Sequence, residues 1–105
     1  MRTVRFAPEY GAYPLWLMDE SDRLIGPQPP EELGTHPDIL ANLDRIEDIY
    51  NSLFIDAEHE FRWKGFDTED EKAEYIALVG VTLTRLKEVL GKEYRIVDHT
   101  YLDRL

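Results

Sequence analysis

Two segments with helical periodicity, residues 35–54 and 68–91, constrain the fold of this chain more than any other feature. The second begins with Thr68 and Glu71, which have the T-x-x-E spacing of a capping box, and Gly91 is suited to end it. Gly80 lies within this helix at a cost in stability, so we expect either a close approach of the first helix or simple tolerance. The apolar face is expected to comprise Ile76, Val79, Gly80, Leu83, Leu86 and Leu90, with Ala73 and Ala77 beside it.

The first helical segment is predicted to begin near Thr35 or His36. Pro37 suits the first turn, and Asp38 interacts favourably with the positive end of the helix dipole. Apolar residues then recur at steps of three and four, which predicts one amphipathic face. These residues are Ile39, Leu40, Leu43, Ile46, Tyr50, Leu53 and Phe54.

Strand-like patterns precede and follow the two helices. Residues 3–6 alternate polar and apolar side chains, and residues 13–18 form a second β-like run. Pro8, Gly11 and Pro14 lie between them and predict a loose β-hairpin, in which Gly11 permits a positive φ. Residues 23–25 suit a short further strand, and the stretch EYRIVDHTYL suits a final one.

The predicted order of elements is ββααβ, which is typical of an α+β fold. We expect a two-layer sandwich in which an antiparallel sheet of about three to four strands packs on both helices. The N-terminal hairpin and the C-terminal strand supply this sheet, with the last strand beside the first. The stretch IDAEHEFRWKGFDTED is expected to form an irregular loop between the helices. A chain of 105 residues can bury one core, so residues 1–105 are expected to form a single domain.

Charge narrows the range of partners. The chain has 22 acidic and 12 basic residues, a formal net charge of −10. Nucleic acid and anionic lipid are therefore poor partners, because both bind mainly through lysine and arginine. A basic protein would be attracted instead. We find no apolar run that suits a signal peptide or a membrane span, so no membrane partner and a cytoplasmic location are expected.

Residue types and spacings give no support for catalysis. The chain has no cysteine, and His36, His59 and His99 lack the spacing of metal ligands. The acidic tract around His59 is expected to be solvated rather than to bind a cation. We therefore predict no enzyme, no catalytic residue, no metal site and no cofactor. A small hydrolase that uses a carboxylate pair and a divalent ion is the less favoured alternative.

Aromatic side chains are the better candidates for binding. If Val4, Phe6, Leu15 and Leu17 face the helices, Trp16 and Met18 face outward; the alternative register places Trp16 in the core. Between the helices lie the rings of Phe61, Trp63 and Phe66. They either cover the helical pair as a lid or form a rim of anchors for a partner. The acids around them form either a solvated surface or a docking surface. The predicted partner-binding residues are Tyr10, Tyr13, Trp16, Asp56, Glu58, Glu60, Phe61, Trp63, Phe66, Asp67, Glu69 and Asp70.

The string RFAPEYGAYPLW, residues 5–16, resembles the opening phrase of a group of small uncharacterised bacterial proteins. In size, acidity and lack of cysteine the chain is also similar to immunity proteins of bacterial toxin systems, which neutralise a partner toxin by covering it. These resemblances imply an acidic binding module that occludes the active site of a cognate basic toxin. The alternative is a structural or regulatory homo-oligomer that pairs, for example as a homodimer, through Trp16 and Met18.

Overall fold

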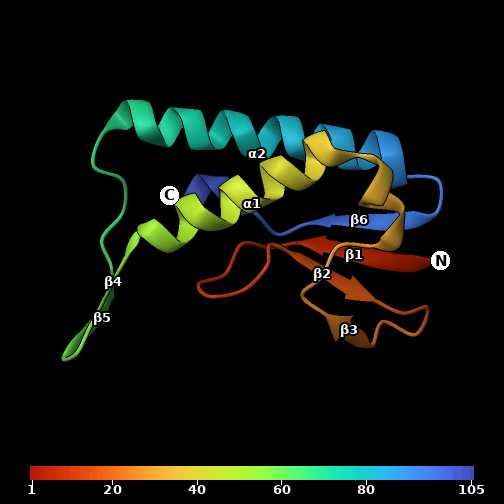
Figure 1. Ribbon diagram of the computed structural model, residues 1–105, viewed down its shortest axis with the longest axis horizontal. Helices are drawn as coiled ribbons and strands as arrows, with labels where there is room; N and C mark the ends of the chain where they lie inside the picture. Colours follow the sequence, from red (N-terminus) through yellow and green to blue (C-terminus); the bar gives the residue numbers. More distant parts are fainter.

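A computed structural model describes residues 1–105 and contains one four-stranded sheet, two helices and a separate two-stranded sheet. Figure 1 shows both helices on the same face of the larger sheet, so the predicted α+β class and its two layers are confirmed. No helix is long and apolar enough to cross a membrane. The elements are β1 (Arg2–Phe6), β2 (Leu15–Met18), β3 (Leu24–Gly26), η1 (Glu31–Thr35), α1 (Pro37–Ser52), β4 (Phe54–Ala57), β5 (Glu60–Trp63), α2 (Glu69–Leu90), β6 (Tyr94–Asp98) and η2 (Leu102–Arg104).

The N-terminal hairpin has the predicted register. Strands β1 and β2 pair antiparallel, and their alternation buries Val4, Phe6, Leu15 and Leu17 against the helices. These four side chains belong to a core cluster of 13 buried residues. Trp16 therefore lies on the outer face of the sheet, half-buried, and the alternative register is wrong.

The last strand lies beside the first, as predicted, but the antiparallel direction expected for it is wrong. The larger sheet has the order β3-β2-β1-β6, and β6 pairs parallel to β1, with Arg2 opposite Tyr94. The long α2 ends near the start of β1 (Figure 1), and the short turn at residues 91–93 leads directly into β6. Both strands consequently run the same way, with the helices as part of the long crossover that parallel pairing requires.

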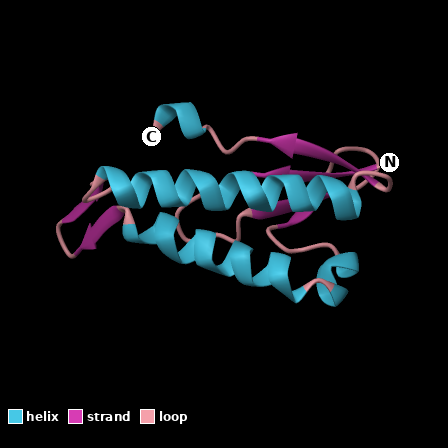
Figure 2. Ribbon diagram, turned by 90° about the horizontal axis from the view of Figure 1, so that it is seen from above, coloured by secondary structure: helices cyan, strands magenta, loops and turns pink.

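The stretch expected as an irregular loop between the helices instead contains the β4–β5 hairpin. Its strands pair from Phe54 opposite Trp63 to Ala57 opposite Glu60, which leaves a turn of two residues, Glu58 and His59. This turn lacks the Asn-Gly or Asp-Gly sequence that marks two-residue hairpins, so its signal is weak. Figure 2 shows the hairpin standing apart from the sheet, beyond the ends of the helices.

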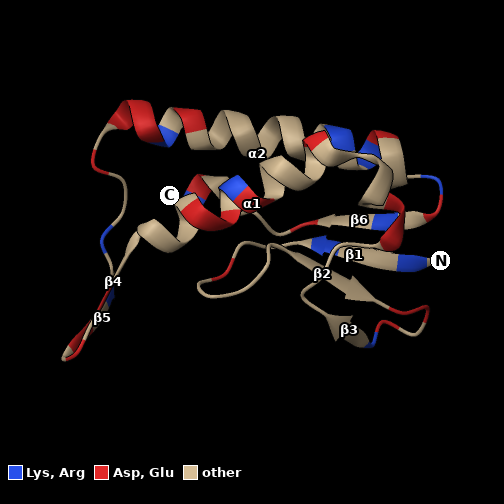
Figure 3. Cartoon of the chain, viewed as in Figure 1, with Lys and Arg blue, Asp and Glu red and all other residues tan.

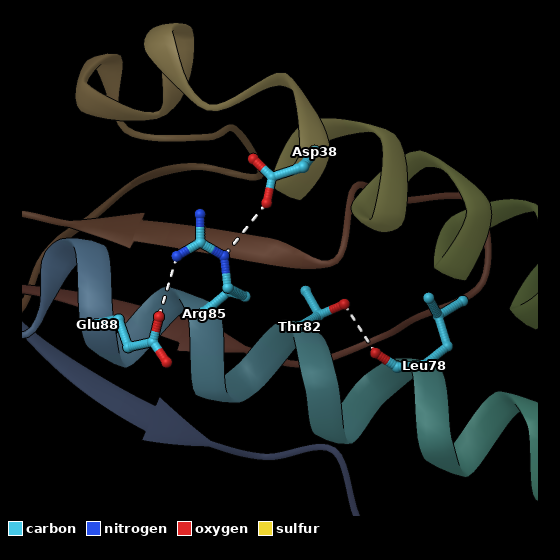
Figure 4. Close-up of polar contacts among 5 residues, drawn as sticks. All are labelled: Asp38, Leu78, Thr82, Arg85 and Glu88. Atoms are coloured by element: carbon cyan, nitrogen blue, oxygen red, sulfur yellow. Dashed lines mark hydrogen bonds and ion pairs between the residues drawn. The ribbon is translucent and has the colours of Figure 1, made fainter.

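The buried face of α2 is rotated from the predicted one. Only Val79, Leu86 and Leu90 belong to both faces. Buried Thr82 lies on the observed face because its hydroxyl donates a hydrogen bond to the Leu78 carbonyl at 2.7 Å (Figure 4) and so needs no partner outside the helix. The buried residues of α2 are Tyr75, Val79, Thr82, Leu86 and Leu90.

An ion-pair network connects the two helices. Arg85 Nε donates to Asp38 Oδ2 at 3.2 Å, and its Nη1 donates to Glu88 Oε2 at 3.0 Å (Figure 4). The first contact joins the end of α2 to the start of α1. Because these side chains are partly exposed, we expect the network to orient the helices more than to stabilise them.

Gly80 is not a site of close helix packing, contrary to one of the two sequence expectations. A Cβ added there would meet no atom within 4 Å, whereas one added at Gly91 would clash with the Lys87 carbonyl oxygen. We expect Gly80→Ala to raise the free energy of unfolding by up to about 1 kcal/mol, since alanine has the higher helix propensity. Gly91→Ala is expected to lower it. Urea unfolding of both variants tests this, and destabilisation by Gly80→Ala would contradict it.

Candidate functional site

The β4–β5 hairpin presents one face made mainly of aromatic rings. Phe54 pairs with Trp63, and Asp56 pairs with Phe61, so the side chains of all four residues project from the same face. The ring of Phe54 stacks on that of Phe61 at 5.5 Å between centroids and meets that of Trp63 edge-on at 5.2 Å. The hairpin therefore holds its three rings in fixed relative positions.

The loop between β1 and β2 packs on this face. The Tyr10 ring lies 5.0 Å from those of both Phe54 and Phe61. Gly11, at a φ of 75°, donates its N–H to Asn51 Oδ1 at 2.9 Å and so attaches the loop to α1. This positive φ agrees with the role predicted for Gly11.

Three rings of this assembly remain accessible to a partner. Tyr10 is 39% exposed, Phe61 is 58% exposed and Trp63 is 42% exposed. We call Tyr10, Phe61 and Trp63 the aromatic patch. Tyr50 supports it from α1, with its ring 6.1 Å from that of Trp63. Exposed Trp and Tyr side chains on a rigid base are typical of the residues that dominate protein–protein affinity.

Asp56 supplies the negative charge on the same face of the hairpin. Its Oδ2 accepts a hydrogen bond from the Tyr10 hydroxyl at 2.8 Å, and this bond raises the pKa of Tyr10. Glu60 projects from the opposite face, where it forms an ion pair with Arg62. Glu58 is exposed in the turn. Figure 3 shows acidic residues at the hairpin tip and at the start of α2, which lie at the same end of the molecule.

Two predicted binding residues lie away from the aromatic patch. Trp16 is on the outer face of the sheet, where its indole N–H donates to the Ala7 carbonyl at 2.9 Å. The outer face also carries Arg5 and Arg95. Pairing of two copies through Trp16 and Met18 on this face stays a prediction. Tyr13 packs against the core, and its burial raises its pKa to about 12.

Two of the remaining predicted residues, Phe66 and Asp67, line a groove between α1, α2 and the segment that joins the hairpin to α2. Phe66 is half-buried and packs on Tyr75, with 5.5 Å between ring centroids, so this ring forms a lid as one sequence alternative proposed. Asp67 forms an ion pair with Lys64 at 3.2 Å. The groove has a volume of about 720 Å³. Glu69 and Asp70 are exposed in the first turn of α2.

Sequence reasoning missed three contributors to this end of the molecule. Helical periodicity places Phe54 and Tyr50 only on the apolar face of α1. The signal for Phe54 is its alternation with Asp56, matched by that of Phe61 with Trp63. Tyr101 follows the last strand and is 48% exposed. It lines a second groove of about 360 Å³, whose other wall includes Trp63 and Tyr50.

The chemistry of this end suits recognition of another molecule. Nowhere in the chain do three or more His, Asp or Glu side chains gather in a way that could hold a metal ion. Rings with accessible faces and a carboxylate between them can bind a cationic group. The geometry therefore favours a binding surface.

Comparison with known proteins identifies the family. A protein-family model described as "Serratia CdiI immunity protein-like" matches residues 2–101. The chain belongs to this family. No curated protein matches it. The match includes all the strands, both long helices and the aromatic patch, and it supports a role in toxin immunity, in which the protein binds a cognate toxin.

Proposed function

We propose that this immunity protein-like chain neutralises a basic toxin by binding it directly and occluding its active site. The family match over residues 2–101 carries the proposal, because an immunity protein acts on a toxin partner. The proposed action is binding without catalysis, and the cytoplasm remains its expected location. Of the partner-binding residues predicted from the sequence, the aromatic patch and Asp56 form the proposed centre, whereas Trp16 and Tyr13 lie away from it.

The charge of the chain supports a basic partner. A formal net charge of −10 produces a field that attracts a positively charged protein and repels an acidic one. Toxins that cleave or bind nucleic acid carry such positive surfaces, because phosphate recognition requires lysine and arginine. An acidic inhibitor can therefore compete for the cations that the toxin uses for its substrate.

Binding to the toxin domain encoded by the adjacent reading frame tests this proposal. We expect a 1:1 complex and loss of toxin activity at stoichiometric inhibitor. We also expect the association rate constant to fall by about tenfold or more between 50 and 500 mM salt, since the attraction is screened.

Two outcomes would contradict separate parts of the proposal. An association rate that does not change with salt would exclude a basic partner. A complex in which the toxin still binds its substrate at full affinity would exclude occlusion of the active site. The absence of any complex would exclude the proposed function as a whole.

A further inference from the structure

The rings of this protein differ in whether the chain itself supplies them with a cation. Arg2 lies 4.7 Å from the centre of the Tyr94 ring, and Arg104 lies 4.6 Å from that of Tyr101. Trp16 has Arg5 at 5.7 Å. No arginine or lysine of the chain lies over Tyr10, Phe61 or Trp63, although all three are accessible. The aromatic patch therefore consists of accessible rings that receive no cation from the chain itself.

We propose that the aromatic patch binds an arginine or lysine side chain on an exposed loop of the toxin, with Asp56 as its counter-charge. This inference rests on the proposed function and specifies the contact through which the toxin is recognised. A cation positioned over the face of Trp, Tyr or Phe is attracted by the ring, and more strongly once the interface excludes water.

The hydrogen bonding of Asp56 supports this assignment. The Tyr10 hydroxyl occupies Oδ2, while Oδ1 has no partner within the protein and Asp56 forms no ion pair. Arg62, the cation of the hairpin, projects from the opposite face and is paired with Glu60. Asp56 is therefore held in place beside the rings while part of its hydrogen-bonding capacity remains free for a guanidinium or ammonium group.

Charge complementarity favours a basic segment as the partner of the hairpin. Residues 54–63 contain three acidic side chains and one arginine, a net charge of −2 with His59 neutral. An acidic loop would be repelled by this charge. A purely apolar loop would desolvate Asp56 without supplying a positive charge to pair with it. The occupant we assign is consequently a cationic loop of the toxin.

Affinity measurements with matched variants test this assignment, with the toxin domain encoded by the adjacent reading frame as the probe. We expect Asp56→Asn and Phe61→Ala each to raise the dissociation constant by about tenfold, mainly through faster dissociation. Asn keeps an oxygen that can accept from Tyr10, so the loop is retained. Leu24→Ala in β3 and Glu20→Gln in the turn before it remove an exposed apolar side chain and an acid far from the hairpin (Figure 1), and we expect each to change affinity by less than about twofold.

The outcomes separate this inference from the proposed function. If the unmodified protein forms the complex but Asp56→Asn and Phe61→Ala bind like it, the inference is wrong and the proposed function stands. Equal losses in the test and control variants would also overturn the inference, because the effect would then be one of overall charge and exposed area. If the unmodified protein neither binds nor inhibits the toxin, the proposed function is wrong. A cooperative unfolding transition well above the assay temperature verifies that each variant is folded.

Discussion

Replacing Phe6 with alanine is expected to lower the free energy of unfolding by about 3–5 kcal/mol. Phe6 is 0% exposed and lies in β1, the strand between β2 and β6, with its ring directed into the core beneath the helices. Truncation of the ring leaves a cavity that this two-layer core can only partly close. Since small domains have a total stability of about 5–15 kcal/mol, the variant will be close to unfolding. Urea unfolding followed by circular dichroism measures the effect.

Phe61→Ala is the matched control, because it removes the same ring from a position that is 58% exposed. We expect this variant to lose less than about 1 kcal/mol. Comparable losses for the two variants would show that the hairpin contributes as much to folding as the core does. That result would contradict the assignment of Phe61 to a surface available for binding.

Raising the pH from 10 to 12 is expected to destabilise the protein strongly. The pKa values of Tyr13 and Tyr94 are raised to about 12, chiefly by burial, and burial also raises the pKa of Tyr75. These rings ionise near pH 10 in the unfolded chain but stay neutral to higher pH in the folded one. The contribution of these neutral, buried rings to the free energy of unfolding is therefore complete below pH 10 and is lost as the pH rises toward 12. Urea unfolding at a series of pH values measures the decline in the free energy of unfolding.

Tyr94→Phe is expected to reduce this loss, because phenylalanine has no proton to release. The same variant leaves Glu32 without the hydroxyl that donates to it at 3.0 Å, so we expect a cost of about 1 kcal/mol at pH 7. Tyr101→Phe, at an exposed ring, serves as the control for other alkaline effects. An identical decline in stability for the unmodified protein and Tyr94→Phe would refute this account of the buried tyrosines.

Most of the secondary structure could be predicted because its signals are local. The capping residue predicted at Thr68 is confirmed, since its side chain accepts from the N–H of Glu71 at 3.1 Å, which is one of the two bonds of a capping box. Pro37 occupies the first turn of α1 as expected. Alternation identified which side chains of the N-terminal hairpin face the core. The buried face of α2 was less predictable, because Thr82 and Tyr75 are polar by type and are buried through contacts that periodicity does not report.

The candidate site could be predicted only in part. The residues proposed from the sequence included the exposed rings and Asp56, because aromatic and acidic side chains are concentrated in those stretches. They also included Trp16 and Phe66, which lie elsewhere on the surface. A pattern of residue types cannot separate these groups, since it does not specify which segments meet.

The sequence by itself determined the types of the elements outside the β4–β5 hairpin, the inward faces of the first strands, the helix ends and the surplus of negative charge. Each of these follows from side-chain chemistry within a few neighbouring residues. Only the tertiary structure decided the direction of β6 and the assembly of the aromatic patch. Those depend on contacts between distant segments, such as Tyr10 with Asp56, 46 positions apart, and Gly11 with Asn51, 40 apart. Such contacts form only when the core has packed, because the packed core supplies the free energy that brings the segments together.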